Sequence, residues 1–257
     1  MKSSISLVSV LLMAVFFLSC TVESGRDAVA LYQEIDTKSL PNTLSRQEAK
    51  KGWILLFDGK KTDGWRGFNM KIFPDCWAIE EECLTMNSQG GGEDQDIITS
   101  QVYRSFAFSV EYKLTTGANS GILYQVSENQ KYKFPYETGP EFQVIDHENW
   151  PDKLEDWQIN GANYAMYPPM VKPYKPLGEW NHAVLVVDGN QVTQILNGQV
   201  VVRYEKSSEE WMKLRNSGKW LDFPDWGSFD SGHISLQNHG TKVWYRSIKI
   251  KELKQTK

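Results

Sequence analysis

Alternation between apolar and polar residues constrains the fold of this chain more than any other feature of its sequence. In "SFAFSVEYKL" the residues Phe106, Phe108, Val110 and Tyr112 would lie on one face of an extended segment. The residues between them are mostly small, polar or charged, and they would lie on the opposite face. A period of two residues is typical of a β-strand with one buried face. The stretch therefore predicts a strand that packs against a core.

Turn signals divide the rest of the chain into further short strands. "HAVLVVDGNQVTQILNGQVVVRY" holds three strands, separated by Asp188-Gly189-Asn190 and by Asn197-Gly198. Asn-Gly is the strongest two-residue hairpin signal, because both positions of a type I′ turn need positive φ. "GHISLQNHG" and "KVWYRSIKIKEL" add two strands, whereas helical periodicity is confined to "SSEEWMKLRN" and "KLEDWQI". The pattern predicts an all-β protein, an antiparallel β-sandwich or jelly roll.

Composition is consistent with one large β domain. The 257 residues include 10 Trp, 11 Tyr and 11 Phe, enough for a substantial core and typical also of proteins that stack rings on sugars. From residue 51 to 257 no linker, charge block or repeat divides the chain, so we expect a single domain. The formal net charge is −4 and no basic block stands out, which argues against a nucleic-acid partner.

The N-terminus has the pattern of an export signal. A lysine at position 2 precedes an apolar stretch too short to span a bilayer, and residues 1–19 read as a signal peptide. Leu18-Ser19-Cys20 resembles the lipobox of bacterial lipoproteins, which makes Cys20 the lipidated first residue. A plain signal peptide with an incidental cysteine is the alternative. We expect residues 20–50 to be a tether and the protein to be an outer-membrane lipoprotein that faces the periplasm.

Two further cysteines lie in "CWAIEEECLTM", which reads as a hairpin turning at Glu81-Glu82. Pairing across this turn sets Glu80 against Cys83 and leaves Cys76 several residues down the ladder. A disulfide needs Cα atoms about 4.4–6.8 Å apart, so we expect two buried thiols.

Two polar patterns indicate a cleft. In "GHISLQNHG" the alternation gives one face to His233, Ser235, Gln237 and His239, an unusual set for a strand that merely faces solvent. "INGANYAMYPPMVKPYKP" is rich in Pro, Gly and Tyr without periodicity, which suits a long loop at the rim of a cleft. In "TGANSGILYQV", Asn119 precedes another strand, although a simple turn explains it equally well.

"GPEFQVID" combines acids and a strand pattern. Regular alternation would put Glu141 and Gln143 on one face and Asp146 on the other, whereas a β-bulge would bring all three to one side. The spacing E-x-Q-x-x-D is similar to the E-x-D-x-x-E of laminarinase-type endoglucanases, in which a bulge brings both glutamates to the cleft. We predict such a bulge. The alternative is a solvated edge strand after which Asp146 begins the loop.

Five ordered motifs carry a resemblance to a known family. They are "LLFDGKKTDGW", "ANSGILYQV", "GPEFQVID", "GEWNHAVLVVDGNQVTQILNGQVV" and "HISLQNHGTKVWYRSIKI". Together they resemble the 3-keto-disaccharide hydrolase domain and cover the chain from Gly52 to Leu253. The resemblance implies a concanavalin-like jelly roll and an enzyme acting on glycosides that are already oxidised at C3. It implies C2 proton abstraction followed by β-elimination or net hydrolysis.

That chemistry needs a base, a group that stabilises an enolate and an acid for the leaving group. The expected catalytic residues are Glu141, Asp146 and His239. The expected substrate contacts are Asn119, Gln143 and Gln237 on sugar oxygens, Arg246 as the compensating charge, and Trp65 and Tyr124 as stacking rings, with Trp157, Tyr164 and Tyr167 as further rings. A divalent metal held by Asp146, His147 and His239 stays open, although no tight ligand spacing supports it.

Three other interpretations remain at this stage. A non-catalytic carbohydrate-binding module would have the same fold but would not need the acids. A two-carboxylate glucanase would act on unoxidised glucans, but Gln143 and the shorter Asp146 count against it. A structural surface protein would not need the polar face at 233–239.

Overall fold

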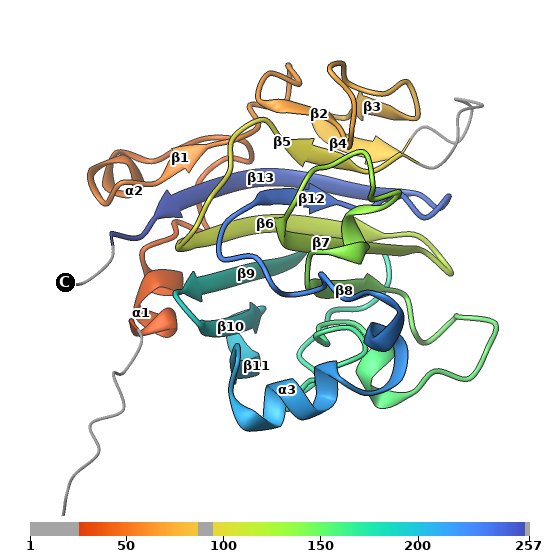
Figure 1. Cartoon of the computed structure of the whole chain (residues 1–257). Helices are drawn as coiled ribbons and strands as arrows, with labels where there is room; N and C mark the ends of the chain where they lie inside the picture. The colour runs from red at the N-terminus through yellow and green to blue at the C-terminus, as the bar shows by residue number, and fades with distance from the viewer. Residues whose placement is uncertain (1–25, 87–94, 255–257) are drawn as a thin grey trace, which may run out of the picture.

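Two antiparallel β-sheets pack face to face in the computed structural model, which describes residues 26–86 and 95–254 (Figure 1). The larger, eight-stranded sheet has the order β11-β10-β9-β6-β13-β4-β3, with β1 paired to β13, and the smaller has the order β2-β5-β12-β7-β8. The strands of the larger sheet are β1 (Ile54–Leu55), β3 (Trp77–Glu80), β4 (Cys83–Met86), β6 (Phe106–Leu114), β9 (Asn181–Asp188), β10 (Gln191–Leu196), β11 (Gln199–Glu205) and β13 (Val243–Glu252). Those of the smaller sheet are β2 (Trp65–Gly67), β5 (Ile97–Thr99), β7 (Asn119–Val126), β8 (Glu141–Ile145) and β12 (His233–Leu236).

Helices are short in the described part of the chain. They are α1 (Ala28–Gln33), α2 (Arg46–Lys50) and α3 (Glu209–Arg215), with 3₁₀ turns η1 (Pro135–Glu137), η2 (Asp156–Gln158) and η3 (Gly218–Asp222). None of these is long and apolar enough to cross a membrane. The predicted antiparallel β-sandwich of the jelly-roll type is confirmed.

The core lies between the two sheets, as the alternation predicts. Phe106, Phe108, Val110 and Tyr112 of β6 are fully buried and belong to one cluster with the inward-facing residues of the smaller sheet, such as Phe142. The inner faces of both sheets are therefore apolar, and the chemistry of the protein has to lie on an outer face or at an end of the sandwich.

The predicted hairpins form where the sequence places them. Asn197 and Gly198 join β10 to β11 with φ of 48° and 84°. Glu81 and Glu82 join β3 to β4 with φ of 51° and 58°, and Glu80 pairs with Cys83 as expected. Both cysteines in this region are buried free thiols, as predicted.

Residues 26–50, which we call the N-terminal strap, are not a free tether. The strap lies on the outer face of the larger sheet, where Ala28 and Leu31 of α1 pack with Val184 and Val186 of β9. The tether prediction is wrong for these residues, because short apolar faces and polar anchors bind them to the sheet. The predicted signal peptide and the lipidation site Cys20 lie outside the described residues.

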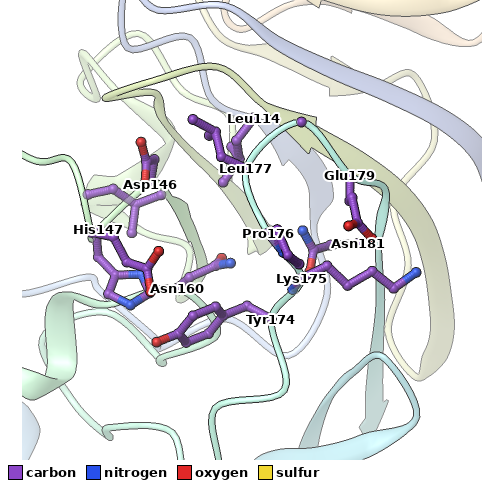
Figure 2. Close-up of a pocket in the computed structure, with 13 residues that line it drawn as sticks. Leu114, Asp146, His147, Asn160, Tyr174, Lys175, Pro176, Leu177, Glu179 and Asn181 are labelled. Carbon is purple, nitrogen blue, oxygen red and sulfur yellow. The ribbon is translucent and has the colours of Figure 1, made fainter.

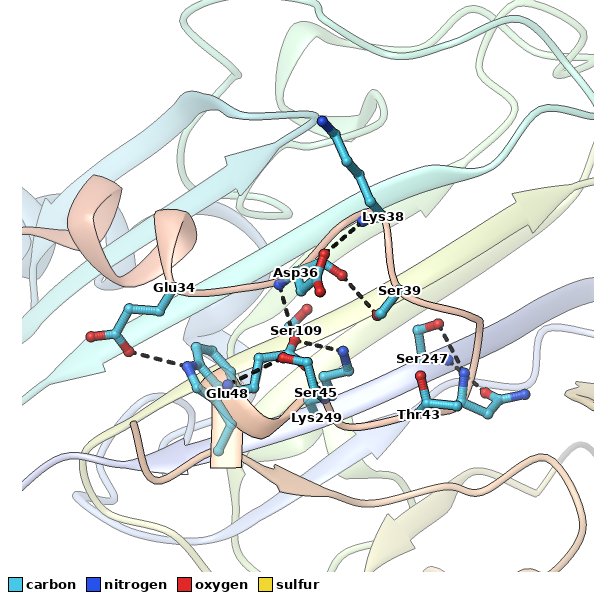
Figure 3. A network of polar contacts seen from close by, with 12 residues as sticks. Glu34, Asp36, Lys38, Ser39, Thr43, Ser45, Glu48, Ser109, Ser247 and Lys249 are labelled. Atoms are coloured by element: carbon cyan, nitrogen blue, oxygen red, sulfur yellow. Dashed lines mark hydrogen bonds and ion pairs between the residues drawn. The ribbon is translucent and has the colours of Figure 1, made fainter. Parts of the chain in front are cut away.

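A buried ion pair fixes the strap (Figure 3). The Lys249 ammonium of β13 lies 2.6 Å from the Glu48 carboxylate of α2, and the two side chains expose 4% and 0% of their surface. The backbone amides of Ser45 and Asp36 also donate to this carboxylate at 2.7 and 3.1 Å. A buried charge pair is tolerated only when hydrogen bonds satisfy its remaining atoms, and these contacts supply them.

The outer face of the smaller sheet is covered only in part. An apolar cluster of Phe68, Ile98, Leu123, Val126 and Tyr132 covers one part of it, beneath the segment that joins β7 to β8. A second segment, 155–167, runs beside the edge strand β8. The Gln143 amide donates to the Ala162 carbonyl and the Gln143 carbonyl accepts from the Gly161 amide, both at 2.9 Å. These two segments border the remaining polar part of the face.

Candidate active site

Polar residues from adjacent strands line up on the outer face of the smaller sheet. Glu141 pairs with Leu123, and Gln143 pairs with Gly121 across β7 and β8. The backbone amide of Gln237, directly after β12, donates to the Gly121 carbonyl at 2.9 Å. The Asp96 carboxylate, directly before β5, accepts from the backbone amide of Asn238 at 2.8 Å. The sheet thus brings together residues that are far apart in the sequence.

Gly121 makes room for Glu141. A Cβ atom at position 121 would lie 2.2 Å from Oε1 of Glu141, closer than any side chain allows. The glutamate side chain therefore lies flat across β7 instead of pointing away from the sheet. A glycine in a strand interior often marks such a close approach.

The Glu141 carboxyl is buried without the partners that a buried acid normally has. Its residue exposes 4% of its surface, and no hydrogen bond from the described part of the chain reaches its carboxylate. The pKa of Glu141 is raised to about 8, mainly by burial; the Lys219 ammonium lowers it and the charge of Asp96 adds to the rise. A strongly perturbed acid on a polar sheet face is a candidate general acid or base.

Lys219 comes to this acid from η3, with its ammonium held above aromatic rings. Its Nζ lies 4.5 Å from the ring centroid of Tyr164 and 5.0 Å from that of Tyr136. Burial among these rings lowers the pKa of Lys219, and the charge of Glu141 acts in the opposite direction. Trp220 anchors η3 in the core by stacking on Trp226, with ring centroids 4.1 Å apart. Sequence reasoning missed Lys219, because a lysine in an aperiodic segment carries no signal of its own.

Tyr164 forms an aromatic wall of the same site. Its backbone amide donates to the Glu141 carbonyl at 3.1 Å, and its ring packs edge-on against Trp157 at 5.6 Å. Burial raises the pKa of the Tyr164 hydroxyl, with a hydrogen bond to Gln158 opposing and the charge of Glu141 adding to the effect. The aperiodic segment predicted to border a cleft does lie beside the acid.

Three predicted substrate contacts lie on this face. Oδ1 of Asn119 is buried and has no donor within the described ranges, so it can accept a hydrogen bond from a ligand hydroxyl. Gln237 is partly exposed. Gln143 is less free, because its side chain donates to the Gln158 carbonyl at 3.2 Å and accepts from the Val144 amide at 3.1 Å.

His239 lies on the exposed loop after β12, with its ring 6.4 Å from that of Trp150 in an edge-on arrangement. Two other members of the predicted polar row, His233 and Ser235, are buried and bonded to the neighbouring strand β5. His233 contacts the Thr99 carbonyl at 2.6 Å, and Ser235 donates to the Ile97 carbonyl at 3.0 Å. Only the C-terminal end of that row is therefore open to a ligand.

Asp146 does not join Glu141, and the predicted bulge is wrong. The register between β7 and β8 runs without a shift from Leu123–Glu141 to Asn119–Ile145. Asp146 accepts from the Gly117 amide at 2.8 Å and from the Asn149 side chain at 2.9 Å, as the cap of a loop. The strand stays regular because β7 offers one partner for each residue of β8.

Asp146 instead lines a separate small cavity at one end of the sandwich (Figure 2). Its volume is about 20 Å³, enough for roughly one water molecule. His147 also lines it and packs edge-on against Tyr174, with ring centroids 4.5 Å apart.

Three other predicted substrate contacts lie elsewhere. Arg246 is on the outer face of the larger sheet, 2.8 Å from the Glu111 carboxylate. Tyr124 is fully buried, with its hydroxyl bonded to that of Tyr204. Trp65 belongs to the core, and its indole donates to the Leu56 carbonyl at 2.9 Å. The alternation alone did not distinguish these inward or opposite-sheet positions from the site.

The predicted metal ligands also stay apart. Asp146 and His147 lie at the small cavity, whereas His239 lies against Trp150. Within the ranges 26–86 and 95–254, no three His, Cys, Asp or Glu side chains form a group that could hold a metal ion.

Comparison with known proteins shows the family and the fold of this chain. Residues 52–251 match the family model described as "3-keto-alpha-glucoside-1,2-lyase-like domain". The chain is similar to the 3-keto-disaccharide hydrolase of Bacteroides thetaiotaomicron, 33% identical over 229 residues that cover 79% of each chain. It is also similar to the crystal structure of a putative glycosyl hydrolase from Parabacteroides distasonis, with 40% identity and a TM-score of 0.79 over 84% of this chain and 100% of the other. A second such structure from that organism shares the fold, at 24% identity and a TM-score of 0.61 over 78% and 99% of the two chains.

Proposed function

Since this chain belongs to the family of 3-keto-alpha-glucoside-1,2-lyase-like domains, a family of glycosyl hydrolase-like enzymes, we propose that it cleaves glycosides whose C3 is already a ketone. The ketone acidifies the proton on C2. A base removes this proton, the C3 oxygen gains enolate character, and the bond from C1 to the aglycone oxygen breaks as the C1–C2 double bond forms. The aglycone takes up a proton and leaves. Addition of water to the unsaturated ketone, with hydrogen to C2 and hydroxyl to C1, completes a net hydrolysis.

The buried Glu141 carboxyl is the single observation that carries this proposal. A carboxylate with a raised pKa is a stronger base than an exposed one, and a weakly acidic C–H proton needs such a base. We assign C2 proton abstraction to Glu141. Its lack of hydrogen bonds within the described chain leaves the carboxylate oxygens free for the substrate.

Lys219 supports the same step from the other side. Its ammonium is a cation held partly out of water among rings, where electrostatic stabilisation of a developing enolate is strong. Asn119 and Gln237 would hold sugar hydroxyls on the adjoining part of the face. His239 is the proposed proton donor to the leaving aglycone, a role supported by its exposed position on the loop that follows Gln237.

The position of Asp146 argues against a direct two-carboxylate glucanase. A retaining glycosidase needs two carboxyl groups about 5–5.5 Å apart on either side of the scissile bond. Asp146 is turned to the loop at the end of the sandwich, and its oxygens are occupied by Gly117 and Asn149.

We also propose that the protein is exported and anchored to the outer membrane through lipid on Cys20, facing the periplasm. The sequence of residues 1–20 supports this. The substrate would then come from a separate dehydrogenase that oxidises C3.

The test is release of a chromogenic aglycone from a 3-keto-glucoside and from the matching unoxidised glucoside. We expect release from the keto substrate only, with a primary isotope effect when C2 carries deuterium. Glu141→Gln should lower kcat/KM about 10²–10⁴-fold, whereas the control Glu205→Gln, at an exposed edge position, should not change it. Release from the unoxidised glucoside would contradict the mechanism, and release from neither would leave a binding module as the better interpretation.

A further inference from the structure

A tyrosine that the proposed reaction has not yet used lies at the same end of the polar face as Glu141. Tyr136 belongs to η1, in the segment that joins β7 to β8, and Glu141 is the first residue of β8. The Tyr136 ring packs against the apolar cluster on the outer face of the smaller sheet. That cluster includes Leu123, which is the cross-strand partner of Glu141. The tyrosine and the buried acid therefore border one site.

Charged groups of the site act on both residues. The Lys219 Nζ lies 5.0 Å from the ring centroid of Tyr136, and its charge also lowers the pKa of Glu141. Burial raises the pKa of the Tyr136 hydroxyl, and the charges of Glu137 and Asp96 add to the rise. The hydroxyl therefore keeps its proton at neutral pH and can act as a hydrogen-bond donor.

The Tyr136 ring is held in place by its neighbours. Phe134 stacks on it with ring centroids 5.1 Å apart and planes 13° apart. Phe223 meets it edge-on, with centroids 5.6 Å apart. Rings packed in this way cannot turn freely, so the hydroxyl at the end of the ring has a defined position.

The Tyr136 hydroxyl has no hydrogen-bond partner in residues 26–86 and 95–254, although the residue is partly exposed and a ligand can reach it. Neighbouring tyrosines differ in this respect. The Tyr132 hydroxyl donates to the Asp225 carboxylate at 2.7 Å, and the Tyr164 hydroxyl is bonded to Gln158. Tyr136 thus combines a fixed ring with an unused donor, the arrangement of a preorganised site for developing negative charge.

We propose that the Tyr136 hydroxyl donates a hydrogen bond to the C3 oxygen of the substrate as this oxygen becomes an enolate. The inference rests on the proposed function. When Glu141 removes the C2 proton, the electron pair of the C–H bond forms a C2–C3 double bond and the C3 oxygen takes up the negative charge. Tyr136 keeps its proton throughout. The C3 carbonyl then re-forms, the C1–C2 double bond appears and the aglycone leaves with the electrons of its bond to C1.

Lys219 and Tyr136 would act on the same oxygen in different ways. The ammonium supplies a positive charge, whereas the hydroxyl supplies a directional bond that strengthens as charge develops. An interaction that is stronger in the transition state than in the bound substrate raises kcat. A contact of equal strength in both states would change KM instead.

The experiment compares Tyr136→Phe with Tyr132→Phe in the release of a chromogenic aglycone from a 3-keto-glucoside. Tyr136→Phe keeps the ring contacts and removes only the hydroxyl. We expect its kcat to fall about 10²–10³-fold, with KM and the Tm of unfolding little changed because the lost hydroxyl has no protein partner in the described ranges. Tyr132→Phe should show the opposite pattern, a lower Tm from the lost bond to Asp225 and an unchanged kcat.

Four outcomes would overturn the inference while the proposed function stands. They are full kcat in Tyr136→Phe, a rise in KM alone, an equal fall in kcat in Tyr132→Phe, and loss of the fold in Tyr136→Phe by circular dichroism, which would show that the hydroxyl has a structural role. Absence of release by the wild-type protein would instead refute the proposed function, and this inference with it.

Discussion

Replacing Glu141 with glutamine should stabilise this protein at neutral pH. The Glu141 carboxyl is 4% exposed, and burial raises its pKa to about 8, compared with about 4.3 in an unfolded chain. Because the folded-state pKa lies above the unfolded one, the acid favours folding least when pH is high. Its unfavourable contribution begins as pH rises past the unfolded pKa and levels off above the folded pKa.

The magnitude follows from that gap. At pH 7 the unfolded glutamate is ionised, because the pH lies about 2.7 units above its pKa of about 4.3. Keeping the carboxyl protonated in the folded state costs about 1.36 kcal/mol for each of these units. The upper limit is therefore about 4 kcal/mol, which glutamine avoids because it has the same shape without a charge. In this variant Lys219 also loses the charge that favours its own ionised form, so the gain is smaller than this limit. For a domain of this size, 1 kcal/mol corresponds to about 2–4 °C in Tm, so we expect a rise of roughly 5–15 °C.

Thermal unfolding followed by circular dichroism at several pH values measures this effect. The gain of Glu141→Gln should be largest at pH 7–8 and should disappear below about pH 4, where an ordinary glutamate is protonated in both states. Glu205→Gln at the exposed edge of β11 is the control and should shift Tm little at any pH. A gain that is absent at pH 7, or that persists unchanged at pH 4, would refute burial of the charge as its cause.

Further predictions concern the same site and the strap. Lys219→Met should move the acidic limb of the kcat/KM profile to higher pH, because the ammonium lowers the pKa of the catalytic base Glu141, while Lys219→Arg should leave the limb near its original position. Gly121→Ala should cost about 1–3 kcal/mol in urea unfolding and reduce turnover, because the new Cβ displaces the glutamate; unchanged turnover would contradict the close approach. Glu48→Gln leaves Lys249 as a buried cation and should cost about 3–5 kcal/mol, with kcat of the folded fraction unchanged. Cys20→Ser should abolish incorporation of radiolabelled palmitate in cells; equal labelling would contradict the lipid anchor.

Local sequence patterns predicted the features that depend on neighbouring residues. Alternation in β6 identifies its buried face, and Asn197-Gly198 and Glu81-Glu82 identify their hairpins. Each of these is decided within about ten residues, by sterics and by which face is apolar. The same reasoning placed an acid, Glu141, on a polar strand face.

Features that depend on a distant partner could not be predicted in this way. A bulge exists only when two residues oppose one on the partner strand, and "EFQVID" alone does not show that β7 supplies a residue for each position. Helices of five or six residues are unstable alone, so the strap could be recognised only through its contact with Lys249. Lys219 reaches the site because Trp220 stacks in a distant part of the core.

The buried acids on the two outer faces of the sandwich differ in their hydrogen-bond partners, and this difference supports the proposed site at Glu141. On the larger sheet the Glu48 carboxylate receives a lysine and two backbone amides, so its charge is fully compensated and it serves the fold. On the smaller sheet Glu141 faces one lysine and no hydrogen-bond donor within the described chain, and nearby Asn119 keeps a buried oxygen without a donor. Sequences that fold reliably satisfy such groups unless function requires them free. A ligand that donates a hydroxyl hydrogen bond to Oδ1 of Asn119 and a proton to the Glu141 carboxylate would satisfy both groups, as the proposed 3-keto substrate would.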